Sequence, residues 1–117
     1  MIKITFYAND RLLEQSFVVL FTGHADYAPK GCDIVCAGVS ALAMALSARL
    51  DACCDHYKVD TSDGRVLMKG EGKDALQAFL TITAGCEVME QEYPDYIAIT
   101  EVSHPEDVTD DQDSDLV

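Results

Sequence analysis

The sequence predicts an α+β fold, a two-layer sandwich in which two helices pack on one face of a largely antiparallel sheet, in the order ββαββαβ. Three observations predict this fold class. Segments that alternate apolar and polar residues occur in neighbouring pairs, as in β-hairpins. Two longer segments repeat their apolar residues at helical spacing. One more alternating segment follows the second of these, and we expect it to complete the sheet.

The first two strands are predicted on either side of a short turn. Residues 2–7 and 13–22 alternate apolar and polar side chains, and the Ala-Asn-Asp-Arg sequence at 8–11 has the composition of a turn. Residues 24–32 follow, with a proline, a glycine and no regular apolar spacing. We therefore expect a β-hairpin and then a mobile loop.

A long helix is predicted after Asp33, whose side chain suits the N-cap position, and we expect it to run to about Asp55. Small residues, mostly alanine, recur through this segment and permit close packing on a sheet. The bulky apolar residues at helical spacing are Val35, Val39, Leu42, Leu46 and Leu50. They predict one buried face of the helix.

The second half of the chain repeats the pattern of a strand pair followed by a helix. Residues 57–61 and 65–69 flank Ser62-Asp63-Gly64, which contains the Asp-Gly signal of a tight hairpin turn. A second helix is predicted over 73–91, and a last strand over 96–102. The predicted inward stripe of the second helix is Leu76, Phe79, Leu80, Thr83 and Cys86.

The chain is predicted to hold one domain, residues 1–102, and an acidic C-terminal tail, residues 103–117. The tail carries six Asp and Glu residues, no Lys or Arg, and almost no bulky apolar side chain. Burial cannot offset the entropy of ordering such a segment, so we expect it to be disordered. The net charge of the whole chain is −13, and without the six acidic residues of the tail it is −7.

This acidity and the distribution of apolar residues limit the partners. Binding to nucleic acid needs a basic face, so the charge argues against direct contact with nucleic acid. The same charge attracts basic peptides, although acidity can also serve solubility alone. Polar residues interrupt the longest apolar run, which argues against a membrane span, and the chain opens on strand-like residues rather than on a secretion signal. We therefore expect a cytoplasmic protein.

Two residues at the ends of the loop have side chains suited to acyl transfer. If Asp33 is the N-cap, Cys36 lies in the first helical turn, where unpaired backbone N–H groups and the helix dipole favour a thiolate over a thiol. Those N–H groups could also hold the oxyanion of a tetrahedral intermediate. His24 lies at the other end of the loop, which is long enough to fold back on the sulfur. Its imidazole could take the thiol proton and later protonate the leaving amine.

Asp33 and Tyr27 could each have one of two roles. Asp33 could orient His24 as a third catalytic residue or could only cap the helix. As a negative charge it opposes thiolate formation unless His24 screens it. Tyr27 could contact a bound peptide or could be an exposed loop residue.

The five cysteines could also serve packing, zinc binding or a redox reaction. Cysteines in alanine-rich helices are most often packing residues, and we expect this of Cys53, Cys54 and Cys86. A zinc site shared by Cys36 and Cys53 is excluded, because the two ends of the helix are about 25 Å apart. We therefore expect no metal and no cofactor. A disulfide between Cys32 and Cys36 would create a thiol-redox site and would mask Cys36.

The motifs around these residues resemble a known family. Gly23-His24-Ala25, a gap that ends in Gly31, and the run Asp33-Ile34-Val35-Cys36-Ala37-Gly38-Val39-Ser40-Ala41-Leu42 are similar to the signature of the ribosomal-processing cysteine proteases (Prp-like), formerly a domain of unknown function. The resemblance covers residues 1 to about 102. The family commonly has two alanines after the nucleophile, where this chain has Ala37-Gly38.

The resemblance implies a function for the chain. Family members are cytoplasmic homodimers that remove a short N-terminal extension from a large-subunit ribosomal protein, cutting after an aromatic residue. Carried over, the nucleophile falls on Cys36, the catalytic histidine on His24 and the acidic residue on Asp33. The implied substrate is a basic ribosomal protein that still carries its extension. Two other functions stay open: a non-catalytic acidic ribosome-associated binding module, and a thiol-redox protein that uses Cys32 and Cys36.

Overall fold

Strands and helices follow one another along residues 1–29 and 31–109, which are the residues that the computed structural model describes. The elements are β1 (Ile2–Asn9), β2 (Ser16–Thr22), α1 (Ile34–Cys53), β3 (Tyr57–Ser62), β4 (Arg65–Glu71), α2 (Lys73–Glu92), β5 (Ile97–Glu101) and the 3-10 helix η1 (Pro105–Asp107). The predicted ββαββαβ order is confirmed.

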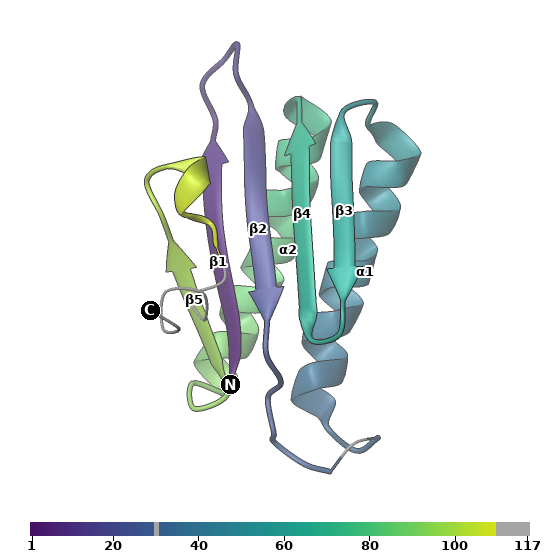
Figure 1. Cartoon of the computed structure of the whole chain (residues 1–117), viewed down its shortest axis with the longest axis vertical. Coiled ribbons are helices and arrows are strands. Elements are labelled where there is room, and N and C mark those ends of the chain that lie inside the picture. The colour runs from purple at the N-terminus through teal and green to yellow at the C-terminus, as the bar shows by residue number, and fades with distance from the viewer. Residues whose placement is uncertain (30, 110–117) are drawn as a thin grey trace.

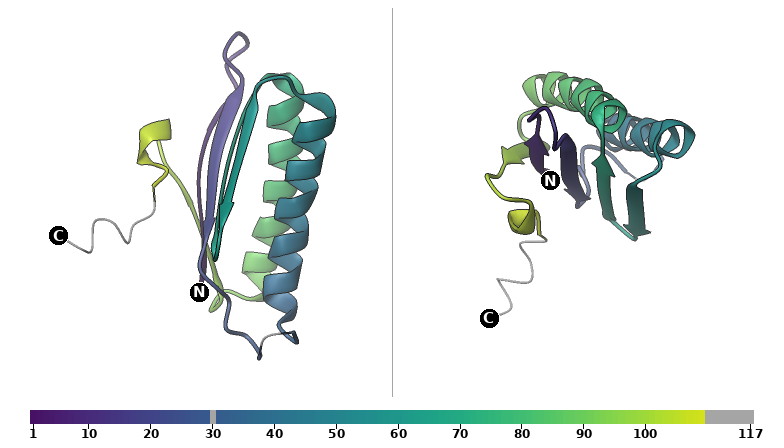
Figure 2. Two further views of the ribbon diagram at one scale, coloured as in Figure 1. Left: turned by 45° about the vertical axis from the view of Figure 1, so that its right-hand side comes forward. Right: turned by 90° about the horizontal axis from the view of Figure 1, so that it is seen from above.

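The strands form one sheet in the order β3-β4-β2-β1-β5 (Figure 1). The pairing of β1 with β5 is parallel, and the other three pairings are antiparallel. Both helices cover the same face of the sheet, and the segment after β5 lies on the opposite side (Figure 2). The α+β class and the largely antiparallel two-layer arrangement are therefore confirmed.

The core lies between the sheet and the two helices. Phe17 of β2 stacks on Phe79 of α2, with ring centroids 4.6 Å apart and ring planes 8° from parallel. Gly70 of β4 leaves room for this pair, because a Cβ at that position would lie 2.7 Å from the Phe17 ring. Burial of large apolar side chains such as these supplies most of the driving force for folding.

Helix α1 buries the predicted face, except that Ala43 is buried in place of Leu42. Its buried residues are Val35, Val39, Ala43, Leu46 and Leu50. Leu42, which was predicted to belong to this face, is half-buried and packs against α2, where a Cβ on Gly85 would lie 3.1 Å from its Cδ2. By length and composition alone α1 could cross a membrane, with 20 residues and a mean hydropathy of 1.5. Core helices pass the same test, and in the structure α1 packs on the sheet and α2.

Helix α2 corrects one predicted core residue. Its buried residues are Ala75, Leu76, Phe79, Thr83 and Cys86. The prediction for Leu80 is wrong, because this side chain is 42% exposed. Successive residues of an α-helix are about 100° apart, so Leu80 points sideways when Phe79 faces the core. Ala75 lies one turn before Phe79 and therefore faces the core in its place.

The first hairpin is shorter than predicted. β2 begins at Ser16, and Leu13 is 93% exposed in the connection from β1. The N–H of Glu14 donates to the carbonyl oxygen of Arg11 across 2.9 Å and closes a turn there. The loop chemistry predicted for residues 8–11 therefore extends toward residue 15.

The segment after β5 has a defined course in its described part. The N–H of Val102 donates to the carbonyl oxygen of Phe6, η1 follows, and Val108 is only 8% exposed. Residues 103–109 of the predicted tail thus pack on the domain. Residues 110–117, with four of the six tail acids, lie outside the described residues, and their predicted disorder stays a prediction.

Candidate active site

His24 stands where the chain leaves the sheet after β2. Gly23 makes this exit possible with a φ of +87°, and a Cβ at Gly23 would clash with the carbonyl oxygen of Met1. The N–H of Gly23 donates to the carbonyl oxygen of Gly64 across 3.0 Å. This bond ties the exit to the β3–β4 turn, so His24 lies beside that turn.

Cys36 lies in the first turn of α1, as predicted. Asp33 is the N-cap: its Oδ1 accepts the N–H of Cys36 across 2.9 Å. Its Oδ2 accepts the N–H of Tyr27 across 3.0 Å. Both carboxylate oxygens therefore bind backbone N–H groups, and these bonds, that of Cys36 above all, hold the pKa of Asp33 below its usual value. Asp33 therefore caps α1 and holds the loop at Tyr27. That Asp33 orients His24 stays a prediction.

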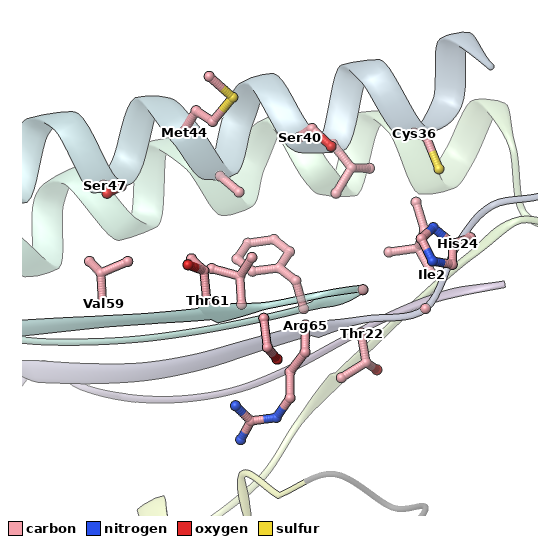
Figure 3. Close-up of a pocket in the computed structure, with 17 residues that line it drawn as sticks. Ile2, Thr22, His24, Cys36, Ser40, Met44, Ser47, Val59, Thr61 and Arg65 are labelled. Carbon is pink, nitrogen blue, oxygen red and sulfur yellow. The ribbon is translucent and has the colours of Figure 1, made fainter. Parts of the chain in front are cut away.

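One hydrogen bond brings the two ends of the loop together. The N–H of Ala25, the residue after His24, donates to Sγ of Cys36 across 3.3 Å. Ala25 is only 3% exposed, so this part of the loop is built into the domain. Figure 3 shows the thiol of Cys36 pointing from α1 toward the sheet, with the imidazole of His24 below it. The structure thus brings together the two side chains that the sequence selected.

The same two side chains line a cavity of about 370 Å³ between α1 and the sheet. Its helix wall is Cys36, Val39, Ser40, Ala43, Met44 and Ser47. Its sheet wall includes Ile2, Phe21, Val59, Thr61 and Val66. The cavity is mostly apolar, with the thiol and the imidazole at one end (Figure 3). A bound chain could therefore meet the thiol while its apolar side chains leave water.

One N–H group of the predicted oxyanion site is occupied in the structure, because that of Cys36 donates to Asp33 Oδ1. The prediction for the other N–H groups of the first turn of α1 stays a prediction. A side-chain cap satisfies donors that would otherwise be free. The N–H of Ala25 is instead the donor directed at the sulfur.

Tyr27 holds the loop against the far side of the domain. Its ring meets those of Tyr93 and Tyr96 edge-on, with centroids 5.6 Å and 5.1 Å away. These two rings belong to the connection between α2 and β5. Tyr27 is exposed, as one of its two predicted roles requires, and its ring also anchors the loop. Its contact with a bound peptide stays a prediction.

Two glycines have contacts that the sequence did not predict. A Cβ on Gly64, whose φ is +68°, would lie 3.2 Å from Nε2 of His24. A Cβ on Gly38 would lie 2.6 Å from Cε of Met89. Gly38 is where this chain departs from the alanine pair of the resembling family, and Met89 of α2 fills the space. The Asp-Gly turn signal pointed to Gly64 but not to its contact with the histidine.

None of the other cysteines lines the cavity. Burial raises the pKa of the Cys86 thiol to about 11. Burial and the neighbouring Cys53, whose Sγ lies 3.3 Å away, raise the pKa of Cys54 to about 11. Cys32 is exposed, and all five thiols are free. Among the described residues, no three His, Cys, Asp or Glu side chains are grouped so that they could hold a metal ion.

Comparisons with known proteins show to which family the chain is related. A model of the family described as cysteine protease Prp matches residues 1–98. The ribosomal processing protease Prp of S. aureus, in complex with a covalently linked product peptide, has a TM-score of 0.75 at 24% identity, over 87% of this chain and 100% of that one. A second structure of that protein, with a substrate peptide, gives a TM-score of 0.69, at 24% identity and with the same coverage.

A Streptococcus mutans protein is 28% identical with a TM-score of 0.65, over 89% of this chain and 96% of that one. No curated protein matches. These likenesses agree with the α+β fold, and the family match extends over most of the domain. The chain therefore belongs to the Prp family of cysteine proteases.

Proposed function

We propose that the protein removes the N-terminal extension of a large-subunit ribosomal protein, with Cys36 as nucleophile and His24 as general acid and base. One observation carries the assignment of the two residues: the thiol and the imidazole share one cavity, and the Ala25 N–H holds the loop onto the sulfur. The substrate is proposed from the family resemblance and from the S. aureus protein, whose structures hold a substrate peptide and a linked product peptide.

The proposed reaction has two steps. His24 takes the thiol proton as Sγ of Cys36 attacks the scissile carbonyl carbon, and the C–N bond breaks as His24 protonates the leaving amine. Water then attacks the thioester, with His24 as base, and releases the acyl product and the free thiol. The Ala25 N–H is the proposed donor to the oxyanion, since it already points at the sulfur.

We further propose that the protein works as a cytoplasmic homodimer. The five free thiols suit a reducing compartment. One exposed face of α1 is apolar, and its residues are Ile34, Ala37, Ala41, Ala45 and Ala48. Ile34 is 57% exposed, which leaves an apolar side chain for a second copy to cover. Light scattering of Ala41→Glu against the unchanged chain tests this: a fall from dimer to monomer is expected, and a monomer in both contradicts it.

The test of the catalytic proposal is cleavage of a ribosomal protein that carries an N-terminal extension with an aromatic residue at the junction. Cys36→Ala and His24→Ala are expected to lower kcat by about 1,000-fold or more, because both groups take part in the same step. Cys32→Ala is the matched control and should cut normally. Mass spectrometry locates the new N-terminus.

Each result separates the proposed functions. Cleavage by Cys36→Ala would contradict the protease assignment. Binding of the extension without cleavage by the unchanged protein would favour the acidic binding module. Equal loss of activity in Cys32→Ala and Cys36→Ala would favour the thiol-redox protein.

A further inference from the structure

The end of α1 brings two thiols into contact. Cys53 is the last residue of the helix and Cys54 is its C-cap. Their Sγ atoms lie 3.3 Å apart, and one thiol donates a hydrogen bond to the other. Neither residue lines the catalytic cavity, and the proposed reaction uses neither. The pair is therefore a second group of reactive atoms whose chemistry is still unassigned.

A change in backbone conformation creates this contact. Side chains of successive residues in an α-helix are about 100° apart and do not face each other. Cys54 has a φ of −122° and a ψ of 140°, which is extended rather than helical backbone. Its N–H still donates to the carbonyl oxygen of Leu50 across 3.0 Å. The chain thus leaves the helix at Cys54, and this turns its thiol toward that of Cys53.

The neighbouring structure holds the two thiols in place. Cys54 packs against the hydrophobic core. The hydroxyl of Tyr57 donates to Oδ1 of Asp51 across 2.5 Å, and the N–H of Glu71 donates to the carbonyl oxygen of His56 across 3.0 Å. These bonds fix the chain on both sides of the pair, while both thiols stay partly exposed. A ligand would therefore meet two sulfurs that are already in position, which lowers the entropic cost of binding.

The separation of the sulfurs favours one class of ligand. Two bonds of about 2.3 Å, the usual length between a thiolate and zinc, join sulfurs about 3.8 Å apart at a tetrahedral centre and about 4.6 Å apart at a linear one. The same two bonds join sulfurs about 3.3 Å apart when they meet at about 90°. Trivalent arsenic is a pyramidal, soft centre that bonds sulfur at a similar length and with angles nearer to 90° than to 180°. The observed 3.3 Å therefore suits arsenic without movement of the thiols.

A metal ion and a disulfide both fit the pair less well. Within residues 1–29 and 31–109, no group of three His, Cys, Asp or Glu side chains could hold a metal ion. Consecutive Cα atoms are about 3.8 Å apart, whereas disulfides usually span about 4.4 to 6.8 Å between Cα atoms. An S–S bond between neighbours is therefore strained and easily reduced. An arsenic bridge leaves the sulfurs at their present separation.

We propose that Cys53 and Cys54 form a binding site for trivalent arsenicals of the form R–As=O, which bridge the two sulfurs. Two S–As bonds form and the As=O bond breaks. The oxygen leaves as water with the two thiol protons, and no electron is transferred. This inference does not depend on the proposed function.

The chemistry and the place of this pair set it apart from Cys36. Burial and the neighbouring Cys53 raise the pKa of Cys54 to about 11, so this thiol keeps its proton at neutral pH. Reagents that need a thiolate therefore react poorly with it, whereas an arsenical carries the oxygen that accepts the proton. Cys36 lies seventeen residues earlier, about 26 Å away along the helix. Figure 1 shows the two ends of α1 at opposite ends of the sheet.

The first test is binding of phenylarsine oxide, followed by intact-mass spectrometry. The unchanged chain should gain one phenylarsenic group, which dithiothreitol removes and 2-mercaptoethanol does not. Cys53→Ser and Cys54→Ser should each weaken binding by about 100-fold or more, because two linked thiols hold one ligand far better than a single thiol does. Cys32→Ser is the matched control and should bind like the unchanged chain. Equal binding by the unchanged chain and by Cys53→Ser overturns the proposal.

The second test maps the arsenic on the unchanged chain, so it decides the question even where a serine at position 54 unfolds the protein. Trypsin cuts after Arg49 and Lys58, and the peptide 50–58 contains no cysteine other than Cys53 and Cys54. The phenylarsenic group should be found on this peptide, and iodoacetamide added after the arsenical should still label Cys36. Arsenic on the peptide 31–49, or loss of the adduct in Cys36→Ala, would assign binding to the other cysteines and overturn the proposal.

Discussion

The backbone N–H of Ala25 points at Sγ of Cys36 across 3.3 Å, and this bond joins the two ends of the segment between β2 and α1. Ala25→Pro removes the donor and is expected to lower kcat/KM by about 10- to 100-fold, because one donor at a developing charge is lost. Ala25→Gly keeps the N–H and is the control. Peptide cleavage at fixed pH measures both variants. An equal loss in the two would assign the effect to packing of the buried methyl group instead.

The β3–β4 turn is expected to position His24. Gly64→Ala places a methyl group 3.2 Å from Nε2 of the imidazole, and it also forces a side chain onto a φ of +68°. We expect a loss of about 1 kcal/mol in the free energy of unfolding, together with a fall in kcat. Urea unfolding and cleavage kinetics measure the two effects separately.

Gly72→Ala is the matched control for this experiment. Gly72 has a φ of +103°, and an added Cβ there meets nothing within 4 Å. Its cost in stability should be at least as large, because a φ of +103° with a ψ of 166° is a conformation essentially restricted to glycine, and kcat should be unchanged. A similar fall in kcat in both variants would show that lost stability, rather than the contact with His24, lowers the activity.

The acid stability of the protein should depend on Asp33. Its folded-state pKa is depressed by the N–H groups that it accepts, so its contribution is present above the unfolded value of 3.8 and is lost as the pH falls through the folded value. Asp33→Asn keeps an acceptor but loses the charge. Its Tm should be lower than that of the unchanged chain near neutral pH, and the difference should shrink below pH 3.8. A difference that is constant with pH would contradict this.

The thiols should differ in their rates of alkylation near neutral pH. Cys86 is 1% exposed and its pKa is raised to about 11, so it should react only after unfolding. The half-buried Cys36 should react in the folded protein, and its modification should stop cleavage. Mass spectrometry after a short treatment with iodoacetamide identifies the labelled residues. Labelling of Cys86 at the rate of Cys36 would show that α2 opens easily.

The contact between Gly38 and Met89 can be measured with a double-mutant cycle. Glycine costs about 1 kcal/mol relative to alanine inside a helix, but a methyl group on Gly38 would meet Cε of Met89 at 2.6 Å. Gly38→Ala should therefore stabilise the chain by about 1 kcal/mol in a Met89→Ala background and by less in the unchanged chain. Equal gains in both backgrounds would mean that Met89 moves aside freely.

The fold was predictable because its signals are local. Alternation, the Asp-Gly turn and the Asp33 cap each act within a few residues, and the order of elements followed from them. Leu80 was misplaced because it neighbours a true core position, and a stripe read from spacing alone does not show where the sheet lies. Leu42 was predicted to be buried, and Ala43 is buried in its place, for the same reason. The packing of α1 on α2 decides which residues beside the central apolar stripe of α1 are covered, and spacing alone does not show this packing.

The pair His24 and Cys36 could be selected because the residue types, the loop length and the family motif agree. The supporting contacts could not, since they join residues far apart in the chain. Gly64 reaches His24 only through the pairing of β3 with β4, and Tyr27 meets Tyr96 only through the parallel pairing of β5 with β1.

The start of β1 has a practical consequence for work on this enzyme. Ile2 lines the catalytic cavity, and Gly23 packs directly against the carbonyl oxygen of Met1. An affinity tag fused ahead of Met1 would emerge beside the cavity that holds Cys36 and would offer this thiol a tethered peptide at high local concentration. The segment after β5 leaves on the side of the sheet away from the helices (Figure 2). The C-terminal end is therefore the better position for a tag, because the last described residues lie on the face of the sheet away from the cavity.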